Sequence, residues 1–266
     1  MQLARFLLIP LAMLGTSPAL AAMVAKPITW TLGGTQFTSM LVYDNATRAR
    51  RPGLVMVPNW TGVNDIAIAK AKRIAGHDYV ILLTDMYGEK IRPRNTAEAQ
   101  AAVKPLYADR GLMRARIRKA FEELRAQAAQ APIDSTRLAA IGFCFGGAAV
   151  LDLARSGADA KAVISFHGDL STDNPALAKN IKARVLAING ADDTSTMPGV
   201  PKFTEEMRQD PADWQFVEIG HAAHCFTETE ATAKTGNCRY DAKAAAQSYR
   251  MMRNWLRESF GEAEQR

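Results

Sequence analysis

Residues 138–147 read Leu-Ala-Ala-Ile-Gly-Phe-Cys-Phe-Gly-Gly, and this stretch decides the fold. Its first part, residues 138–143, is a short apolar run typical of a strand buried on both faces. The run leads into a Gly-x-Cys-x-Gly motif centred on Cys144, and a helix-compatible stretch follows at residues 148–155. A strand, a sharp turn and a helix in this order predict an exposed nucleophile at the turn, here a cysteine in place of the usual serine.

The glycines of this motif have a physical reason. Gly142 and Gly146 lack side chains, which allows the strand and the helix to approach each other while the turn holds Cys144 in a strained conformation. The N-terminus of the following helix also favours thiolate over thiol. Taken alone, however, the motif fits a buried, inert cysteine equally well, so the rest of the chain must decide between the two interpretations.

Short apolar runs recur along the chain, and helical patterns separate most of them. This alternation predicts an α/β fold in which one domain, residues 22–266, has a mainly parallel sheet with helices on both faces. Two β-rich runs flanking Gly33-Gly34 predict an N-terminal β-hairpin. The expected strands are residues 28–32, 35–42, 53–57, 79–83, 138–143, 162–166, 184–188 and 214–219.

The sequence contains four helical patterns of particular interest. Residues 65–75 and 242–260 have apolar residues at helical spacing. A third helix opens at Asn95, and we expect Pro105 to interrupt it. A fourth apolar stripe begins at Met113, and we interpret the arginines between its members as a solvated face.

Composition narrows the class of protein. The chain has 266 residues, of which 48% are hydrophobic and 23% charged, and these values exclude disorder and coiled coil. Lys and Arg outnumber Asp and Glu by 33 to 27. This excess is spread along the chain without a block of like charges, so we expect no nucleic-acid partner.

The first residues predict export. Residues 1–21 combine one basic residue, an apolar stretch and a small-residue cleavage site, as a secretory signal peptide does. We expect a periplasmic protein with no stable membrane anchor after cleavage. In that oxidising compartment, Cys225 and Cys238 are expected to form a disulfide, which leaves Cys144 as a free thiol.

A nucleophile needs a base, and the base needs an acid that orients it. The strand at residues 184–188 is followed by Asp192 and Asp193, and the strand at residues 214–219 is followed by His221 and His224. Both residue types therefore stand beyond the carboxyl ends of strands, in the order that α/β-hydrolases use. Spacing does not choose between the two aspartates or between the two histidines.

The two histidines could also be half of a metal site, but no further ligand type clusters beside them in the sequence. We expect no metal and no cofactor. His167, which directly follows the strand at residues 162–166, is expected to be a packed structural histidine.

At this point the chain resembles the dienelactone hydrolase family of α/β-hydrolases. The resemblance is carried by Val57-Pro-Asn-Trp-Thr-Gly-Val-Asn-Asp65, Thr84-Asp-Met-Tyr-Gly88, Ile141-Gly-Phe-Cys-Phe-Gly-Gly147, Gly190-Ala-Asp-Asp193 and His224-Cys-Phe226. Family members carry the acid as Gly-x-x-Asp and the histidine as His-x-Phe, so the resemblance implies a triad of Cys144, Asp193 and His224. It also implies an oxyanion hole formed by the backbone N–H groups of Trp60 and Phe145.

Three departures from the family pattern concern activation of the thiol and the choice of substrate. Asn59 stands where the best-studied type has a glutamate beside the thiol, so activation of Cys144 should fall to His224 directly. Glu89 and Glu228 stand near the places of two arginines that hold a substrate carboxylate. Two carboxylates would repel an anion, so an uncharged or cationic ester or lactone fits better. We expect Asn59, Tyr87 and Glu228 to line the substrate site.

The sequence thus predicts a hydrolase that cleaves a small ester or lactone through a thioester acyl-enzyme. One alternative is a non-catalytic binding or thiol redox-sensing protein on a hydrolase scaffold, since fold does not fix function. Another is a redox enzyme that cycles Cys144 with Cys225.

Overall fold

The computed structural model describes residues 23–209 and 211–262. The predicted signal peptide, residues 1–21, lies outside this range. In the described ranges, no helix combines the length and the apolar character that crossing a membrane requires.

One eight-stranded sheet organises the molecule, with strand order β1-β2-β4-β3-β5-β6-β7-β8. The hairpin of β1 and β2 is antiparallel, β2 pairs antiparallel with β4, and every other pair is parallel. The α/β fold and the N-terminal hairpin are therefore confirmed. The strands are β1 (Met23–Leu32), β2 (Thr35–Asp44), β3 (Arg51–Val57), β4 (Val80–Leu83), β5 (Ile133–Phe143), β6 (Ala162–Phe166), β7 (Arg184–Gly190) and β8 (Trp214–Ile219).

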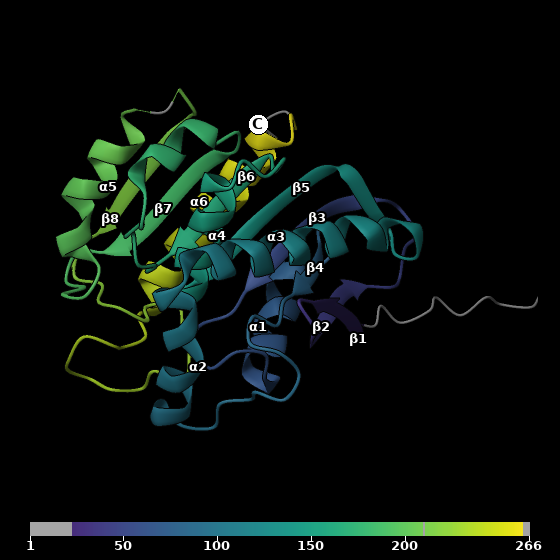
Figure 1. Cartoon of the computed structure of the whole chain (residues 1–266), viewed down its shortest axis with the longest axis horizontal. Coiled ribbons are helices and arrows are strands. Elements are labelled where there is room, and N and C mark those ends of the chain that lie inside the picture. The colour runs from purple at the N-terminus through teal and green to yellow at the C-terminus, as the bar shows by residue number, and fades with distance from the viewer. Residues whose placement is uncertain (1–22, 210, 263–266) are drawn as a thin grey trace, which may run out of the picture.

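Helices cover both faces of this sheet, as predicted. Figure 1 shows α3 and α4 in front of the sheet and α6 behind it. Two apolar clusters fill the layers, one between the sheet and α3, α4 and α5, the other between the sheet and α1 and α6. The helices are α1 (Asp65–Ala75), α2 (Thr96–Ala108), α3 (Arg110–Ala126), α4 (Phe145–Arg155), α5 (Val200–Met207) and α6 (Ala242–Ser259).

The prediction that Pro105 interrupts its helix was wrong. Helix α2 continues through Pro105 to Ala108. A proline removes the backbone N–H that would bond the carbonyl four residues earlier, so the helix loses one hydrogen bond at Pro105 but does not end there. The Pro105 carbonyl still accepts a hydrogen bond from Asp109 N at 3.0 Å.

Two arginines of α3, Arg114 and Arg116, are not part of a solvated face, which corrects a second expectation in part, whereas Arg118 and Arg125 are exposed. Arg114 binds the Asp173 carboxylate at 2.7 Å, and Arg116 donates to the Met86 carbonyl at 2.7 Å. Both arginines therefore connect α3 to neighbouring segments. Periodicity alone could not show this, because long arginine side chains reach back across the surface that a helical wheel assigns to solvent.

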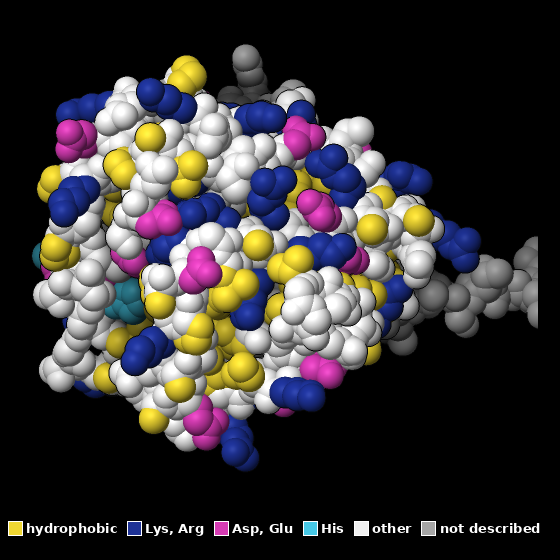
Figure 2. All heavy atoms as spheres, in the orientation of Figure 1, with side chains coloured by type: hydrophobic (Ala, Val, Ile, Leu, Met, Phe, Trp, Pro, Cys, Tyr) yellow, Lys and Arg dark blue, Asp and Glu magenta, His cyan; other side chains and the backbone are white. Residues whose placement is uncertain are grey.

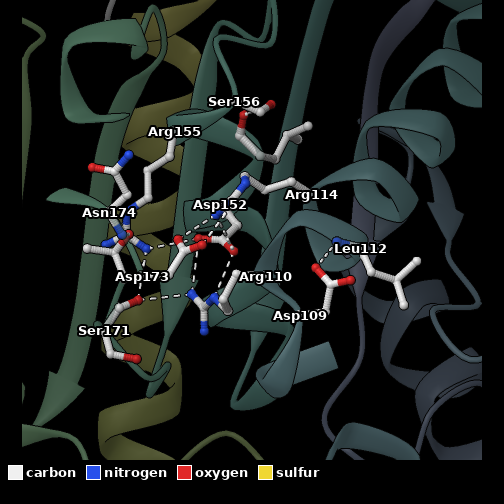
Figure 3. Close-up of polar contacts among 12 residues, drawn as sticks. Asp109, Arg110, Leu112, Arg114, Asp152, Arg155, Ser156, Ser171, Asp173 and Asn174 are labelled. Carbon is white, nitrogen blue, oxygen red and sulfur yellow. Dashed lines mark hydrogen bonds and ion pairs between the residues drawn. The ribbon is translucent and has the colours of Figure 1, made fainter. Parts of the chain in front are cut away.

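A buried ionic cluster holds α4, the helix that follows the proposed nucleophile (Figure 3). Asp152 accepts two hydrogen bonds from Arg110 at 2.9 and 3.0 Å and one from Arg155 at 3.2 Å. Arg155 also binds Glu206 of α5 through two hydrogen bonds. We call Arg110, Asp152, Arg155 and Glu206 the helix cluster, since it fixes α4 against α3 and α5.

Candidate active site

Cys144 lies at the sharp turn between β5 and α4, with φ of +54° and ψ of −117°. A non-glycine residue with positive φ is strained, and such strain concentrates at functional sites. The flanking glycines are required by close approach of the backbone. A Cβ on Gly142 would lie 2.0 Å from the Gly146 carbonyl oxygen, and a Cβ on Gly146 would lie 2.2 Å from that of Val57.

The structure brings one histidine and one aspartate to this cysteine. His224 Nε2 lies 3.1 Å from Cys144 Sγ, and His224 Nδ1 lies 2.7 Å from Asp193 Oδ2. The neighbours of these residues in sequence face away, since His221 and Asp192 are exposed and Asp192 approaches Arg239 instead. The alternatives that spacing left open are therefore separated by geometry: of the two histidines His224 contacts the sulfur, and of the two aspartates Asp193 contacts His224.

Asp193 is fully buried and is held by groups that sequence reasoning missed. Its Oδ1 accepts hydrogen bonds from the Ser195 hydroxyl at 2.6 Å and from Asn237 Nδ2 at 3.2 Å. Its Oδ2 accepts one from the Thr196 hydroxyl at 2.6 Å. Burial raises the pKa of Asp193, but the hydrogen bonds from His224, Ser195 and Thr196 outweigh it and hold the pKa well below the usual range. The acid is thus an ionised, oriented acceptor.

The pKa of His224, by contrast, is raised. Burial lowers it, but the contacts with Asp193 and Cys144 are stronger and raise the pKa to about 10. The imidazole therefore carries a proton at neutral pH and faces the sulfur with a ring nitrogen.

The predicted disulfide is present and lies beside this histidine. Cys225 and Cys238 are bonded, and among the described residues Cys144 is the free cysteine. Arg239 N donates to the His224 carbonyl at 3.0 Å, so the disulfide-linked segments run together. Cys225 is therefore bonded to Cys238 and not to Cys144.

The backbone N–H groups of Phe145, the residue after Cys144, and of Trp60 remain open. The Phe145 amide begins α4, and the Trp60 amide lies in the loop after β3; no described residue accepts a hydrogen bond from either. The Trp60 segment is held from both sides. Its carbonyl accepts from the Tyr87 hydroxyl at 2.9 Å, while Asn59 Oδ1 accepts from Thr61 N at 3.0 Å. These are the features expected of an oxyanion hole.

Glu228 is not a free carboxylate facing the substrate, which corrects the charge argument made from the sequence. It is 4% exposed and accepts from Lys70 Nζ at 2.6 Å and from Asn59 Nδ2 at 2.7 Å. Burial raises its pKa, but Lys70 and His167 oppose this and the pKa is lowered. We call Lys70, Glu228 and Asn59 the site bridge, because it joins the loop after His224 to the loop that carries Trp60.

Lys70 is the member of the site bridge that sequence reasoning missed. A signal existed, because Lys70 falls on the same face of α1 as Ala67, Ala71 and Ile74, all of which are buried. A lysine on an apolar face implies a buried partner. The partner, Glu228, lies 158 residues further along the chain, so its identity could not be inferred locally.

Aromatic side chains surround the nucleophile. The Tyr87 and Tyr107 rings lie 5.7 and 5.9 Å from the Phe145 ring, measured between centroids. Burial raises the pKa of Tyr87 well above its usual range, so its hydroxyl stays protonated and keeps donating to Trp60. His167 is fully buried behind His224, with its Nε2 2.7 Å from the Thr227 hydroxyl and its pKa lowered to about 3 by burial. Among the described residues, no group of three or more His, Cys, Asp and Glu could hold a metal ion.

The chain is similar to several known proteins. The chain is 36% identical to a dienelactone hydrolase-like promiscuous phosphotriesterase, P91, from metagenomic libraries, with a TM-score of 0.81 over 90% of this chain and 100% of that one. It is 37% identical to a solved structure named m3DLH, with a TM-score of 0.81 over 90% of this chain and 99% of that one.

A curated relative of Caenorhabditis elegans, described as uncharacterized, is 34% identical over 132 residues, which are 48% of this chain and 84% of that protein. The family model of the dienelactone hydrolases matches residues 38–260. That match spans Cys144, Asp193 and His224. The chain therefore belongs to the dienelactone hydrolase family, has the α/β-hydrolase fold and is a carboxylic ester hydrolase.

Proposed function

We propose that the chain hydrolyses a small, uncharged carboxylic ester or lactone through a triad of Cys144, His224 and Asp193. The observation that carries this proposal is the continuous contact from sulfur to imidazole to carboxylate, at 3.1 and 2.7 Å. Three groups in hydrogen-bond reach, in these roles, are the geometric signature of nucleophilic catalysis.

The reaction has two halves. The Cys144 thiolate attacks the ester carbonyl, and the Phe145 and Trp60 amides stabilise the negative oxygen of the tetrahedral adduct. The His224 imidazolium then donates its proton to the leaving alkoxide, which leaves a thioester on Cys144. In the second half, neutral His224 takes a proton from water, the resulting hydroxide attacks the thioester, and the carboxylic acid leaves as the Cys144 thiolate and imidazolium re-form.

The surroundings of the sulfur favour an uncharged substrate. Tyr87, Tyr107 and Phe145 supply apolar surface, and the positive charge of Lys70 is bound to Glu228 rather than available to an anion. Esters are favoured over amides because a tetrahedral adduct on sulfur expels the thiolate more readily than an amine.

Replacing Cys144 tests this proposal. We expect Cys144→Ala to lower turnover of a small chromogenic ester by about 10³-fold or more, as removal of a nucleophile does. Mass spectrometry of the wild type during turnover should find one acyl group on Cys144. His221→Ala is the matched control for His224→Ala. We expect ester turnover to be lost in His224→Ala and kept in His221→Ala. Undiminished turnover in Cys144→Ala, or an acyl group on another residue, would refute the mechanism.

A panel of substrates defines the class. Acetate and butyrate esters, a neutral lactone and a lactone carboxylate should be compared, and we expect the anionic compound to be the poorest. The similarity to P91 justifies adding a neutral phosphotriester. Turnover of that compound should also depend on Cys144.

We also propose that the protein is exported after cleavage following residue 21. The Cys225–Cys238 disulfide supports this, because such bonds persist in oxidising compartments. N-terminal sequencing of the mature protein should begin at Ala22; retention of Met1 would contradict it.

A further inference from the structure

A cavity of about 640 Å³ lies at the end of the molecule away from Cys144. It is lined where β3 and β5 begin and where α6 ends, whereas the triad stands beyond the carboxyl ends of the parallel strands. Figure 1 shows the C-terminal end of α6 at the top of the view and α2, whose Tyr107 ring lies near that of Phe145, at the bottom. Six arginines line the cavity: Arg50, Arg51, Arg137, Arg250, Arg253 and Arg257.

Within the described residues, the positive charge of this arginine cavity is neutralised only at Arg137, which contacts the Asp134 and Glu262 carboxylates at 2.7 and 2.6 Å. The cavity lining holds two carboxylates, Asp78 and Glu262, and Glu262 is already bound to Arg137 at 2.6 Å. For the five other arginines, no carboxylate of the described residues lies within ion-pair distance. On the face drawn in Figure 2, by contrast, Lys and Arg are scattered among other side chains.

Two guanidinium groups of the cavity have buried N–H groups without a partner. Arg51 is 6% exposed, and its Nη2 donates to the Asp44 carbonyl at 2.7 Å, but its Nε has no acceptor. Arg253 Nη1 is likewise buried and unpartnered. Leaving a buried donor unsatisfied is costly, and most so when the group is charged. These two guanidinium groups are therefore not fully paired within the described residues.

The position of α6 does not by itself explain this arrangement. Cations near the end of a helix are stabilised by its dipole, which accounts for Arg257 in the last turn. Arg50, Arg51 and Arg137 come from other segments, around β3 and in β5. Their convergence on one hollow is a property of the folded chain.

We propose that the arginine cavity binds a small polyanion that carries two or more phosphate groups. Guanidinium groups match phosphate oxygens with paired hydrogen bonds, and unlike ammonium groups they stay charged at any accessible pH. The volume suits a ligand larger than one phosphate ion. Soluble oligophosphates and the phosphate head groups of lipids share this chemistry.

Calorimetric titration of the full chain with inorganic tripolyphosphate tests the proposal. We expect saturable binding of one tripolyphosphate, at least about 10-fold tighter than binding of orthophosphate and weakened by added salt. The double variant Arg250→Gln/Arg253→Gln should lose at least about 10-fold in affinity. The control Arg94→Gln/Arg118→Gln removes the same charge outside the cavity and should keep the affinity.

Ester turnover provides a check on folding, since it should be equal in both double variants. If the first variant does not fold, Arg50→Gln, at an exposed position, should show the same loss of affinity in smaller degree. Displacement of tripolyphosphate by vesicles of phosphatidylglycerol would assign the site to lipid head groups, and no displacement would assign it to soluble ligands. Absence of saturable binding at about 1 mM tripolyphosphate, or equal losses in both double variants, would overturn the proposal.

Discussion

The site bridge and the helix cluster are both buried ionic groups, yet they hold different things. Lys70 and Glu228 of the site bridge are at least 95% buried, as are Asp152 and Arg155 of the helix cluster. The site bridge joins α1, through Lys70, to the loops that carry Trp60 and His224. The helix cluster ends on helices α3, α4 and α5, together with the carbonyls of Leu170 and Ser171.

This difference teaches what buried charge does in this protein. Desolvation offsets much of the attraction between buried ions, so neither group is a simple source of stability. What each group specifies is the relative position of the segments that it joins. For the site bridge those segments carry reacting groups, so we expect its loss to appear in turnover. For the helix cluster they are packed helices, so we expect its loss to appear in stability.

The largest expected effect is on turnover and comes from Asp193→Asn. The amide would favour the wrong imidazole tautomer and remove the charge that stabilises the imidazolium, so kcat should fall by about 10⁴-fold. Asp192→Asn is the matched control, because Asp192 is exposed and does not contact His224. Equal kcat values in the two variants would remove Asp193 from the mechanism.

The next effect is on stability. Arg155→Leu leaves Glu206 buried without its cation and removes one of the arginines that bind Asp152, which keeps Arg110, so the free energy of unfolding should fall by about 3–5 kcal/mol. The control Arg125→Leu breaks the exposed pair with Asp159 and should cost less than about 1 kcal/mol. Denaturant titration measures both. Activity per folded molecule should be unchanged in Arg155→Leu. A large loss of activity in this variant would contradict the expectation that the helix cluster affects stability and not turnover.

A smaller effect on turnover is expected when the site bridge is cut at Asn59. Asn59→Ala frees the Trp60 segment, so kcat should fall by about 10- to 100-fold with little change in KM, since an oxyanion donor acts mainly in the transition state. Asn95→Ala removes the cap of α2 and serves as control, with a stability loss of about 1 kcal/mol and normal turnover. A change in KM alone would instead make Asn59 a substrate-binding residue.

The pH dependence of kcat/KM should also distinguish a variant of the active site from a variant of the helix cluster. Because the pKa of His224 is about 10, kcat/KM should hold to about that pH and then fall roughly tenfold per pH unit. A raised pKa contributes stability fully below the unfolded value of 6.5, and this contribution is lost as pH rises toward 10. Asp193→Asn should move the falling limb of kcat/KM to lower pH, whereas Arg155→Leu should leave it in place. An unmoved limb in Asp193→Asn would show that the limb belongs to another group.

The sequence predicted the active site better than it predicted the surroundings of that site. The turn at Cys144 and the residues that follow the strands are local patterns, and the family resemblance chose Asp193 and His224 from their neighbours. The pairing of Lys70 with Glu228 was missed, and so was the contact of Asn237 with Asp193. Both contacts join residues that lie far apart in the chain, and hydrophobic periodicity carries no information about such contacts.

The sequence by itself determined the layered α/β fold, the strained turn at Cys144 and the order of the candidate triad. These follow from hydrophobic periodicity and glycine placement, which act over a few neighbouring residues. Only the tertiary structure decided that Glu228 is neutralised and that six scattered arginines line one cavity. The physical reason is that charge acts through space, so its effect depends on which distant segments the sheet brings together and on how much water remains between them.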